Sequence, residues 1–132
     1  MAYQFTKDLE TGNPTIDQQH RQLIGAINDL LDACGQGKGR AHLEASAKFL
    51  QEYTARHFAD EERLQQQSNY PDFSNHKRYH EAFKKVVADF TQRLNAEGPN
   101  IVLVGELNNA LAGWLINHIK REDVKVAAHL RR

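Results

Sequence analysis

Hydrophobic residues recur every three or four positions through most of the chain, and turn-forming residues divide this pattern into four segments. "GNP" precedes the first segment, "GQGKG" ends it, "SNYPDFSN" separates the second from the third, and "EGPN" precedes the fourth. A period of three to four residues is typical of helices with one buried face. The pattern therefore predicts helices at about residues 16–34, 40–67, 75–96 and 101–123 or slightly beyond.

Residues suited to helix ends support these limits. Thr15 and Gln18 have the spacing of a capping box, and Ser74 or Asn75 can cap the third helix. No strand-like alternation and no repeat is present. Four helices with short connections predict an all-α fold, an antiparallel up-down-up-down four-helix bundle. We expect one domain over residues 1–132, with an N-terminal arm to about 15 and a short tail after about 123.

Five of the seven histidines lie on the apolar helix faces. In an up-down-up-down bundle, the starts of the first and third helices and the ends of the second and fourth share one end. Five histidines and one acid should meet there: His20, His57, Glu61, His76, His80 and His118. Burying them without partners would cost several kcal/mol each, and a bound cation removes that cost. The sequence therefore predicts a metal site at this end of the bundle.

Other residues on or near these faces have simpler interpretations. The apolar face of the second helix continues from Glu61 to Leu64, which we expect to pack. His42 lies at the opposite end of that helix and His129 near the C-terminus, so both are expected to be solvated. Cys34 packs or is exposed near the end of the first helix.

The fourth helix carries two candidate acids after its histidine, in "WLINHIKRED". On an ideal helix Glu122 lies about 40° around from His118, whereas Asp123 lies about 140° away. Simple helical geometry therefore favours Glu122 as the partner of His118.

The ligand types restrict the metal without identifying it. Six or seven ligands are too many for one tetrahedral zinc, but they suit two metals that share carboxylates. Imidazole and carboxylate ligands are compatible with iron, manganese or zinc. No glutamate stands three positions before any histidine, which disfavours a ferritin-like oxidase site.

Composition argues against several other classes of function. Seventeen basic and seventeen acidic residues cancel, so no electrostatic reason exists to bind nucleic acid or an anionic membrane. A single cysteine allows no internal disulfide or thiolate cluster and fits a reducing compartment. No secretion signal or membrane-spanning run is visible, so we expect a cytoplasmic location.

The composite of His20, "HFADE", "YPDFSNHKRYH" and "WLINHIKRED" resembles the pattern of the hemerythrin family, in particular of its bacterial members. The order and spacing match from "ETGNPTIDQQH" to Asp123. Phe5 departs from the tryptophan usual in the arm of bacterial members, which puts the packing of the arm in question. The resemblance implies a non-haem di-iron centre, with two iron ions bridged by an oxo or hydroxo group, that binds dioxygen reversibly.

The resemblance also implies a ligand set. In the family pattern the bridging acid follows the histidine by five residues, which favours Asp123 over Glu122. The helix must then end, unwind or form a π-type turn there. The implied ligands are His76, His80 and His118 on one iron, His20 and His57 on the other, and Glu61 and Asp123 as bridges.

One coordination position is left open by this ligand set, on the iron with two histidines. Trp114, Leu115 and Ile119 are expected to form an apolar dioxygen pocket without an acid–base residue. This favours oxygen storage, delivery or sensing over an enzyme with peroxidase, oxidase or nitric-oxide-consuming activity. A structural or iron-sensing domain is a third, weaker interpretation. We expect a monomer, and the sequence leaves open whether the chain belongs to a larger sensory protein.

Overall fold

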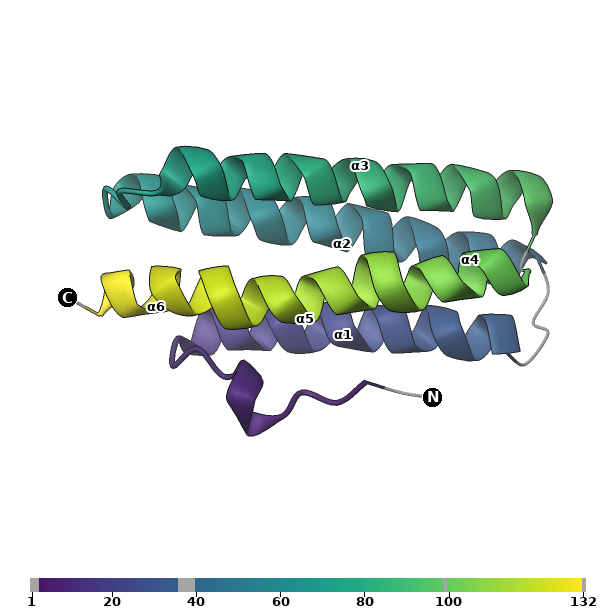
Figure 1. Ribbon diagram of the computed structural model, residues 1–132, viewed down its shortest axis with the longest axis horizontal. Helices are drawn as coiled ribbons and strands as arrows, with labels where there is room; N and C mark the ends of the chain where they lie inside the picture. The colour runs from purple at the N-terminus through teal and green to yellow at the C-terminus, as the bar shows by residue number, and fades with distance from the viewer. Residues whose placement is uncertain (1–2, 36–39, 99, 132) are drawn as a thin grey trace.

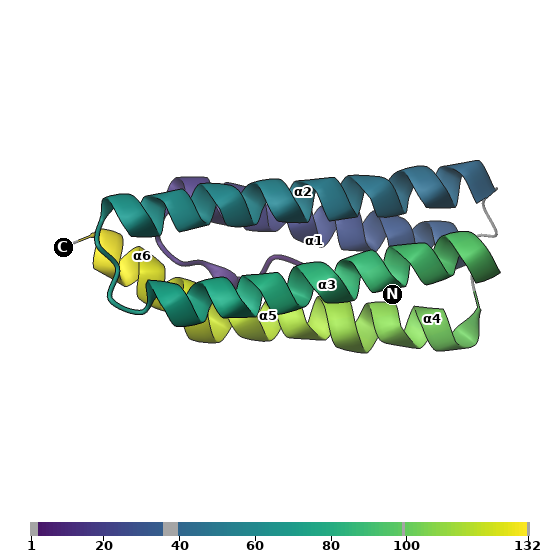
Figure 2. The ribbon, with the colours of Figure 1, turned by 90° about the horizontal axis from the view of Figure 1, so that it is seen from above.

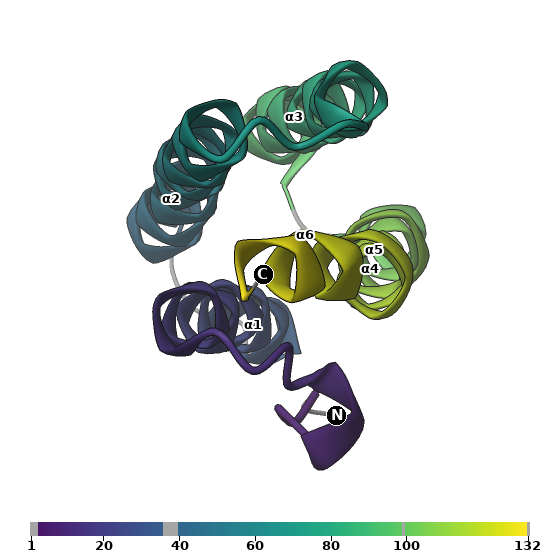
Figure 3. The same cartoon turned by 90° about the vertical axis from the view of Figure 1, so that its left-hand side faces the viewer.

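Four antiparallel helical rods pack side by side in the computed structural model, which describes residues 3–35, 40–98 and 100–131. Figures 1 and 2 show the rods lengthwise, and the end view in Figure 3 shows them around a common core. The fourth rod contains two π-helical segments, η2 and η3. The first three rods are α1 (Pro14–Gly35), α2 (Arg40–Gln67) and α3 (Phe73–Glu97). The fourth consists of α4 (Ile101–Glu106), η2 (Leu107–Gly113), α5 (Trp114–His118), η3 (Ile119–Asp123) and α6 (Val124–Leu130), and a short 3-10 helix, η1 (Lys7–Leu9), lies in the arm.

The predicted up-down-up-down bundle is confirmed. α2 packs against α1 and α3, and the fourth rod packs against α1 and α3 as well. The expected breaks "GQGKG" and "EGPN" lie partly outside the described residues. None of the helices in the described part of the chain is long and apolar enough to cross a membrane.

The bundle core is built from aromatic and aliphatic side chains on the inward helix faces. Phe58, Phe83 and Phe90 are almost fully buried, together with many leucine and isoleucine side chains. Burial of each such side chain contributes about 1.5–3 kcal/mol relative to exposure. This apolar core occupies most of the bundle length and leaves one end for the polar cluster.

The helix ends differ in detail from the sequence expectations. Asn13, not Thr15, caps α1, because its side chain accepts a hydrogen bond from the backbone of Ile16 at 3.0 Å. Pro14 then occupies the first helical position, where its missing N–H costs nothing. α3 begins at Phe73, slightly before the expected caps. At its other end Gly98, with a φ of 75°, donates to the carbonyl of Leu94.

The C-terminal residues do not form the tail expected after residue 123. α6 continues the fourth rod to Leu130, and Val126 and Ala127 are buried. The expectation that His129 is solvated is also wrong, because its Nε2 lies 2.8 Å from the carbonyl oxygen of Ser68 and its ring packs edge-on against Tyr70. His42 is exposed, as expected. The C-terminal helix is thus attached to the loop between α2 and α3.

The joint between the arm and α1 is held by a buried carboxylate. Asp17 accepts hydrogen bonds from the backbone N–H and the hydroxyl of Thr11, at 2.9 and 2.7 Å. Arg131 donates to the carbonyl of Thr11 at 2.8 Å. Gly12 has a φ of 91°, and a Cβ there would lie 2.6 Å from Nη1 of Arg131. The turn therefore depends on glycine for its backbone conformation, whereas the Arg131 side chain could shift to make room for a Cβ.

The N-terminal arm lies along the bundle and is fixed by a few polar contacts. Asn28 accepts from the backbone N–H of Tyr3 and donates to its carbonyl, both at 2.7 Å. The hydroxyl of Tyr3 donates to Asn108 in η2 at 2.9 Å. Phe5 packs against the core, with the guanidinium of Arg21 4.6 Å above its ring. Phenylalanine at this position is therefore compatible with a packed arm.

Replacing Asn28 with alanine should release the arm. Two hydrogen bonds to Tyr3 disappear, so the free energy of unfolding should fall by about 1–2 kcal/mol, and the arm should become more susceptible to limited proteolysis. Urea unfolding measures the first effect. Asp29→Ala, at the exposed neighbouring position, is the control and should change neither property. Unchanged stability of Asn28→Ala would contradict this account of the arm.

Candidate metal centre

Seven histidine and carboxylate side chains meet at the end of the bundle that holds the start of α1 and the C-terminal helix. Each is at most 5% exposed. Their ligand atoms form two groups that share both carboxylates. The three-histidine group comprises Glu61, His76, His80, His118 and Asp123, and the two-histidine group comprises His20, His57, Glu61 and Asp123. The structure thus brings together all seven residues that the sequence singled out.

Glu61 divides its two oxygen atoms between the groups. Its Oε1 lies 2.7 Å from Nε2 of His76 and 3.4 Å from Nε2 of His80. Its Oε2 lies 3.3 Å from Nε2 of His57 and 3.9 Å from Nε2 of His20. One carboxylate therefore reaches both groups, which is the geometry that a bridging ligand requires.

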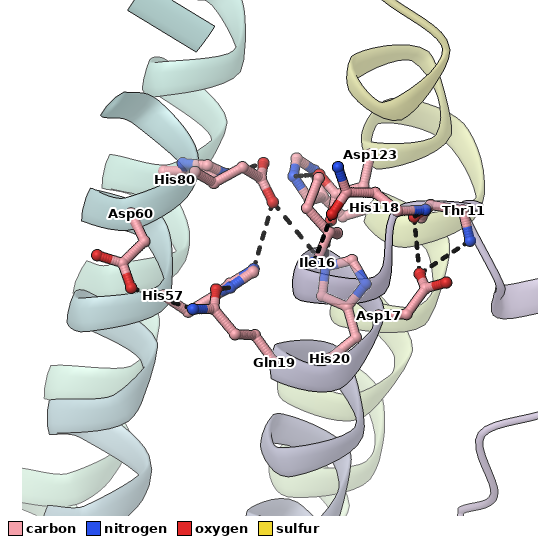
Figure 4. A network of polar contacts seen from close by, with 12 residues as sticks. Thr11, Ile16, Asp17, Gln19, His20, His57, Asp60, His80, His118 and Asp123 are labelled. Carbon is pink, nitrogen blue, oxygen red and sulfur yellow. Dashed lines mark hydrogen bonds and ion pairs between the residues drawn. The ribbon is translucent and has the colours of Figure 1, made fainter. Parts of the chain in front are cut away.

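Asp123 is divided in the same way from the opposite side. Its Oδ1 lies 3.1 Å from Nε2 of His76 and 3.2 Å from Nε2 of His118, while its Oδ2 lies 2.9 Å from Nε2 of His20. Figure 4 shows Asp123 and His118 on the fourth rod and His20 on α1. The two carboxylates thus connect the same two groups of histidines.

A π-helical turn places Asp123, and not Glu122, beside His118. η3 covers Ile119–Asp123, and the N–H of Val124 donates to the carbonyl of Ile119 five residues earlier. In a π-helical turn the hydrogen bond spans five residues instead of the four of an α-helix. The residue that comes to lie beside His118 is therefore the fifth after it, Asp123, instead of the fourth, Glu122. Glu122 lies outside both groups and faces Lys125 at 3.7 Å. The choice from ideal helical geometry is therefore wrong, and a π-type turn is present.

The cluster has the polar atoms that a cation would bind. Within these seven side chains, six buried atoms have no hydrogen-bond partner: Nδ1 and Nε2 of His20, Nε2 of His57 and of His80, Oε2 of Glu61 and Oδ1 of Asp123. The Nε2 atoms of His76 and His118 are 3.2 Å apart. Buried polar atoms without partners are costly, and Nε2 atoms that converge on carboxylate oxygens suit metal ions. The residues therefore fit a two-metal centre.

Two histidines are oriented from behind by residues that the sequence analysis did not identify. Nδ1 of His57 lies 2.6 Å from the side-chain oxygen of Gln19, whose amide nitrogen donates to Asp60 at 3.1 Å. Figure 4 shows this chain from Asp60 to His57. Nδ1 of His80 lies 2.9 Å from Glu62. Such contacts fix the ring orientation and leave Nε2 for the metal. The only sequence signal is that Gln19 and Glu62 adjoin His20 and Glu61.

Aromatic rings hold two histidines of the three-histidine group in place. Phe58 stacks on His80 with ring centroids 3.8 Å apart, and Trp114 stacks on His118 at 4.5 Å and on Phe83 at 4.2 Å. Trp114 also lines a surface groove with Tyr79 and Arg121, among other residues. It therefore lies beside the three-histidine group, close to His118 as expected, and its part in a dioxygen pocket stays a prediction.

The other two expected pocket residues are buried. Leu115 and Ile119 are at most 1% exposed and belong to the apolar core. Leu115 also lines a narrow apolar crevice with Ile24, Ile27 and Ile116, among others, which has no room for a water molecule. Because Leu115 and Ile119 are buried on either side of His118, they can exclude water from its surroundings. Their part in a dioxygen pocket stays a prediction.

His76 and the two carboxylates of the cluster have strongly shifted pKa values. Burial alone would lower the pKa of His76, but the carboxylates of Asp123 and Glu61 close to its Nε2 raise it to about 9. Burial and the charge of Asp123 would raise the pKa of Glu61, but the imidazoles of His57, His76 and His80 close to its oxygens hold it below its usual range. Without a metal, protonated imidazole balances the buried carboxylates, and a cation can replace those protons.

The stability of the metal-free protein should fall as the pH rises from 6.5 to 9. The pKa of His76 is raised from 6.5 to about 9, so its contribution is fully present below 6.5 and is lost towards 9. The loss should be at most about 3 kcal/mol. Zinc-loaded protein should gain stability over the same interval, because neutral imidazole binds metal. The test is to measure the urea midpoint of unfolding at several pH values between 6.5 and 9, once with chelator and once with zinc. If the midpoint changed with pH in the same direction in both series, the account would be contradicted.

Comparisons with known proteins agree with this site. A family model for the hemerythrin HHE cation-binding domain matches residues 11–130. A bacteriohemerythrin of Stenotrophomonas maltophilia is 39% identical, covering 95% of this chain and 82% of the relative. A myohemerythrin of Theromyzon tessulatum is 30% identical, covering 97% and 93%. The crystal structure of a leucine-to-tyrosine variant of hemerythrin matches over 100% of both chains with a TM-score of 0.86 at 26% identity. The chain therefore belongs to the hemerythrin family.

Proposed function

We propose that this protein binds dioxygen reversibly at two iron ions held by the seven clustered residues. The observation that carries the proposal is that Glu61 and Asp123 each divide their two oxygens between the same two groups of histidines. Membership of the hemerythrin family supports iron as the metal and an oxygen-binding protein rather than an enzyme.

The ligand assignment follows the two groups. His76, His80 and His118 would hold one iron, His20 and His57 the other, and Glu61 and Asp123 would bridge them. An oxo or hydroxo bridge between the irons is part of the same proposal. Two ferrous ions at this site would supply the electrons that dioxygen takes up on binding and returns on release. With fewer histidines, the two-histidine group would leave a coordination position open to dioxygen.

The surroundings of the site favour binding over turnover. Leu115 and Ile119 are buried on the helix that carries His118, where they exclude the water that could supply protons. Glu62 is close to the cluster, but its carboxylate contacts Nδ1 of His80, behind the ring and away from the shared carboxylates. It therefore orients a ligand of the three-histidine group. Storage, delivery or sensing, a monomeric state and a cytoplasmic location stay predictions.

Cycling the protein between oxygen and argon tests the proposed function. Reduced, iron-loaded protein should gain a visible absorption band in oxygen, lose it under argon and regain it over repeated cycles. His57→Ala should abolish the reversible band, whereas His42→Ala should keep it because His42 is exposed and outside both groups. A spectrum that never reverts, with catalytic consumption of reductant and peroxide or nitric oxide, would favour an enzyme instead.

Asp123→Ala and Glu122→Ala should have very different effects on iron content. Loss of Asp123 removes a buried carboxylate that reaches both groups, so the protein should keep one iron or none where the unchanged protein holds two. Glu122→Ala should keep both, because Glu122 is outside the groups. Iron per chain is measured by elemental analysis after anaerobic loading and desalting. The reverse ranking would overturn the bridging role of Asp123.

Leu115→Ala should speed the irreversible oxidation of the oxygenated protein. The smaller side chain opens the apolar wall to water and protons. Leu111→Ala is a matched control, because Leu111 is equally buried but lies one turn farther from His118. Both variants should lose about 2–5 kcal/mol of stability, and only Leu115→Ala should oxidise several-fold faster. Decay of the visible band over time is the measurement, and equal rates in both variants would contradict this role of Leu115.

A further inference from the structure

Gln65 is fully buried beside the bridging carboxylate, although the two glutamines that follow it are exposed. It lies one turn beyond Glu61 on the same face of α2. Its amide nitrogen donates to Oε1 of Glu61 at 3.4 Å, and its own side-chain oxygen has no hydrogen-bond partner. The sequence pattern placed Leu64 on this face, but Leu64 is only half-buried. A polar amide therefore occupies a position where an apolar side chain would pack at lower cost.

The backbone of Gln65 is held from the loop that follows α2. Its carbonyl accepts from the N–H of Tyr70 at 2.8 Å and from the hydroxyl of Ser68 at 3.3 Å. The carbonyl of Ser68 is in turn contacted by His129 of α6. The last turn of α2 is thus held by the loop that follows it and, through Ser68, by α6. The side-chain amide of Gln65 therefore extends towards Glu61 from a backbone that is fixed in place.

The contact distinguishes the two oxygens of Glu61. Gln65 donates to Oε1, the oxygen that faces His76 and His80, and makes no hydrogen bond with Oε2, which faces His57. A carboxylate can bind one metal through both oxygens or two metals through one oxygen each. A donor fixed on one oxygen opposes rotation of the carboxylate about its own axis. It therefore favours the arrangement in which Oε2 stays directed at the two-histidine group.

We propose that Gln65 is a positioning residue that keeps Glu61 bridging between the two metal positions, so that the second metal ion binds. This proposal rests on the proposed function, because it requires a two-metal centre. Gln65 does not bind the metal itself; it acts through Glu61. Without it, both oxygens of Glu61 can turn to the metal in the three-histidine group, and the two-histidine group loses one of its ligands.

Gln65→Met tests the proposal, because methionine has a similar length and no amide. The metal-free variant should fold at least as well, since an unpartnered buried oxygen disappears. In anaerobic titrations with zinc, the first ion should bind as in the unchanged protein and the second about tenfold more weakly or worse. The separation of the two carboxylate stretching bands in the infrared spectrum should also change, because it differs between bridging and chelating carboxylates. Gln65→Leu provides a second apolar variant if Gln65→Met does not fold.

Gln66→Met is the matched control, because it makes the same substitution at the next, exposed position. It should bind two zinc ions with unchanged affinities and infrared bands. Equal binding of the second ion by Gln65→Met and Gln66→Met would overturn the role of Gln65 and leave the two-metal centre intact. Binding of only one ion by the unchanged protein would overturn the two-metal centre and this assignment together.

Discussion

The burial of five imidazoles and two carboxylates at one end of a helical bundle is the constraint on which the rest of the structure depends. These seven side chains are at most 5% exposed, and in water each would be well solvated. Their burial is tolerable only if charges and hydrogen-bonding atoms are matched, by protons in the metal-free chain or by cations. The apolar core holds the four rods together. Phe58 and Trp114 stack on His80 and His118 and orient them. α6 lies at the end of the bundle that contains the cluster.

The π-helical turn shows how a local backbone irregularity serves this constraint. An α-helix through residues 118–123 would bring Glu122 towards His118 and leave Asp123 on another face. Closing the turn over five residues exchanges the two acids, so that Asp123 enters the cluster and Glu122 pairs with Lys125 near the surface. A second π-helical segment, η2, carries the Asn108 side chain that the arm contacts. Both irregularities therefore lie where the fourth rod makes a polar contact.

Much of the fold and the cluster could be predicted, because periodicity and topology depend on residue type alone. The four rods and the convergence of His20, His57, His76, His80 and His118 followed from the apolar pattern and the antiparallel order. The supporting residues could not be predicted in this way. Gln19, Glu62 and Gln65 act through side-chain direction and burial, and a glutamine or glutamate in a helix is usually exposed. The position of His129 depends on a contact with Ser68, far away in the sequence.

The most direct test of a shared two-metal centre is anomalous diffraction at the iron edge from crystals of the iron-loaded protein. This account predicts two iron peaks about 3.5–4 Å apart. One should lie among His76, His80 and His118, the other between His20 and His57, and Glu61 and Asp123 should contact both. A single iron peak, or two peaks with Asp123 turned away and Glu122 in its place, would contradict it.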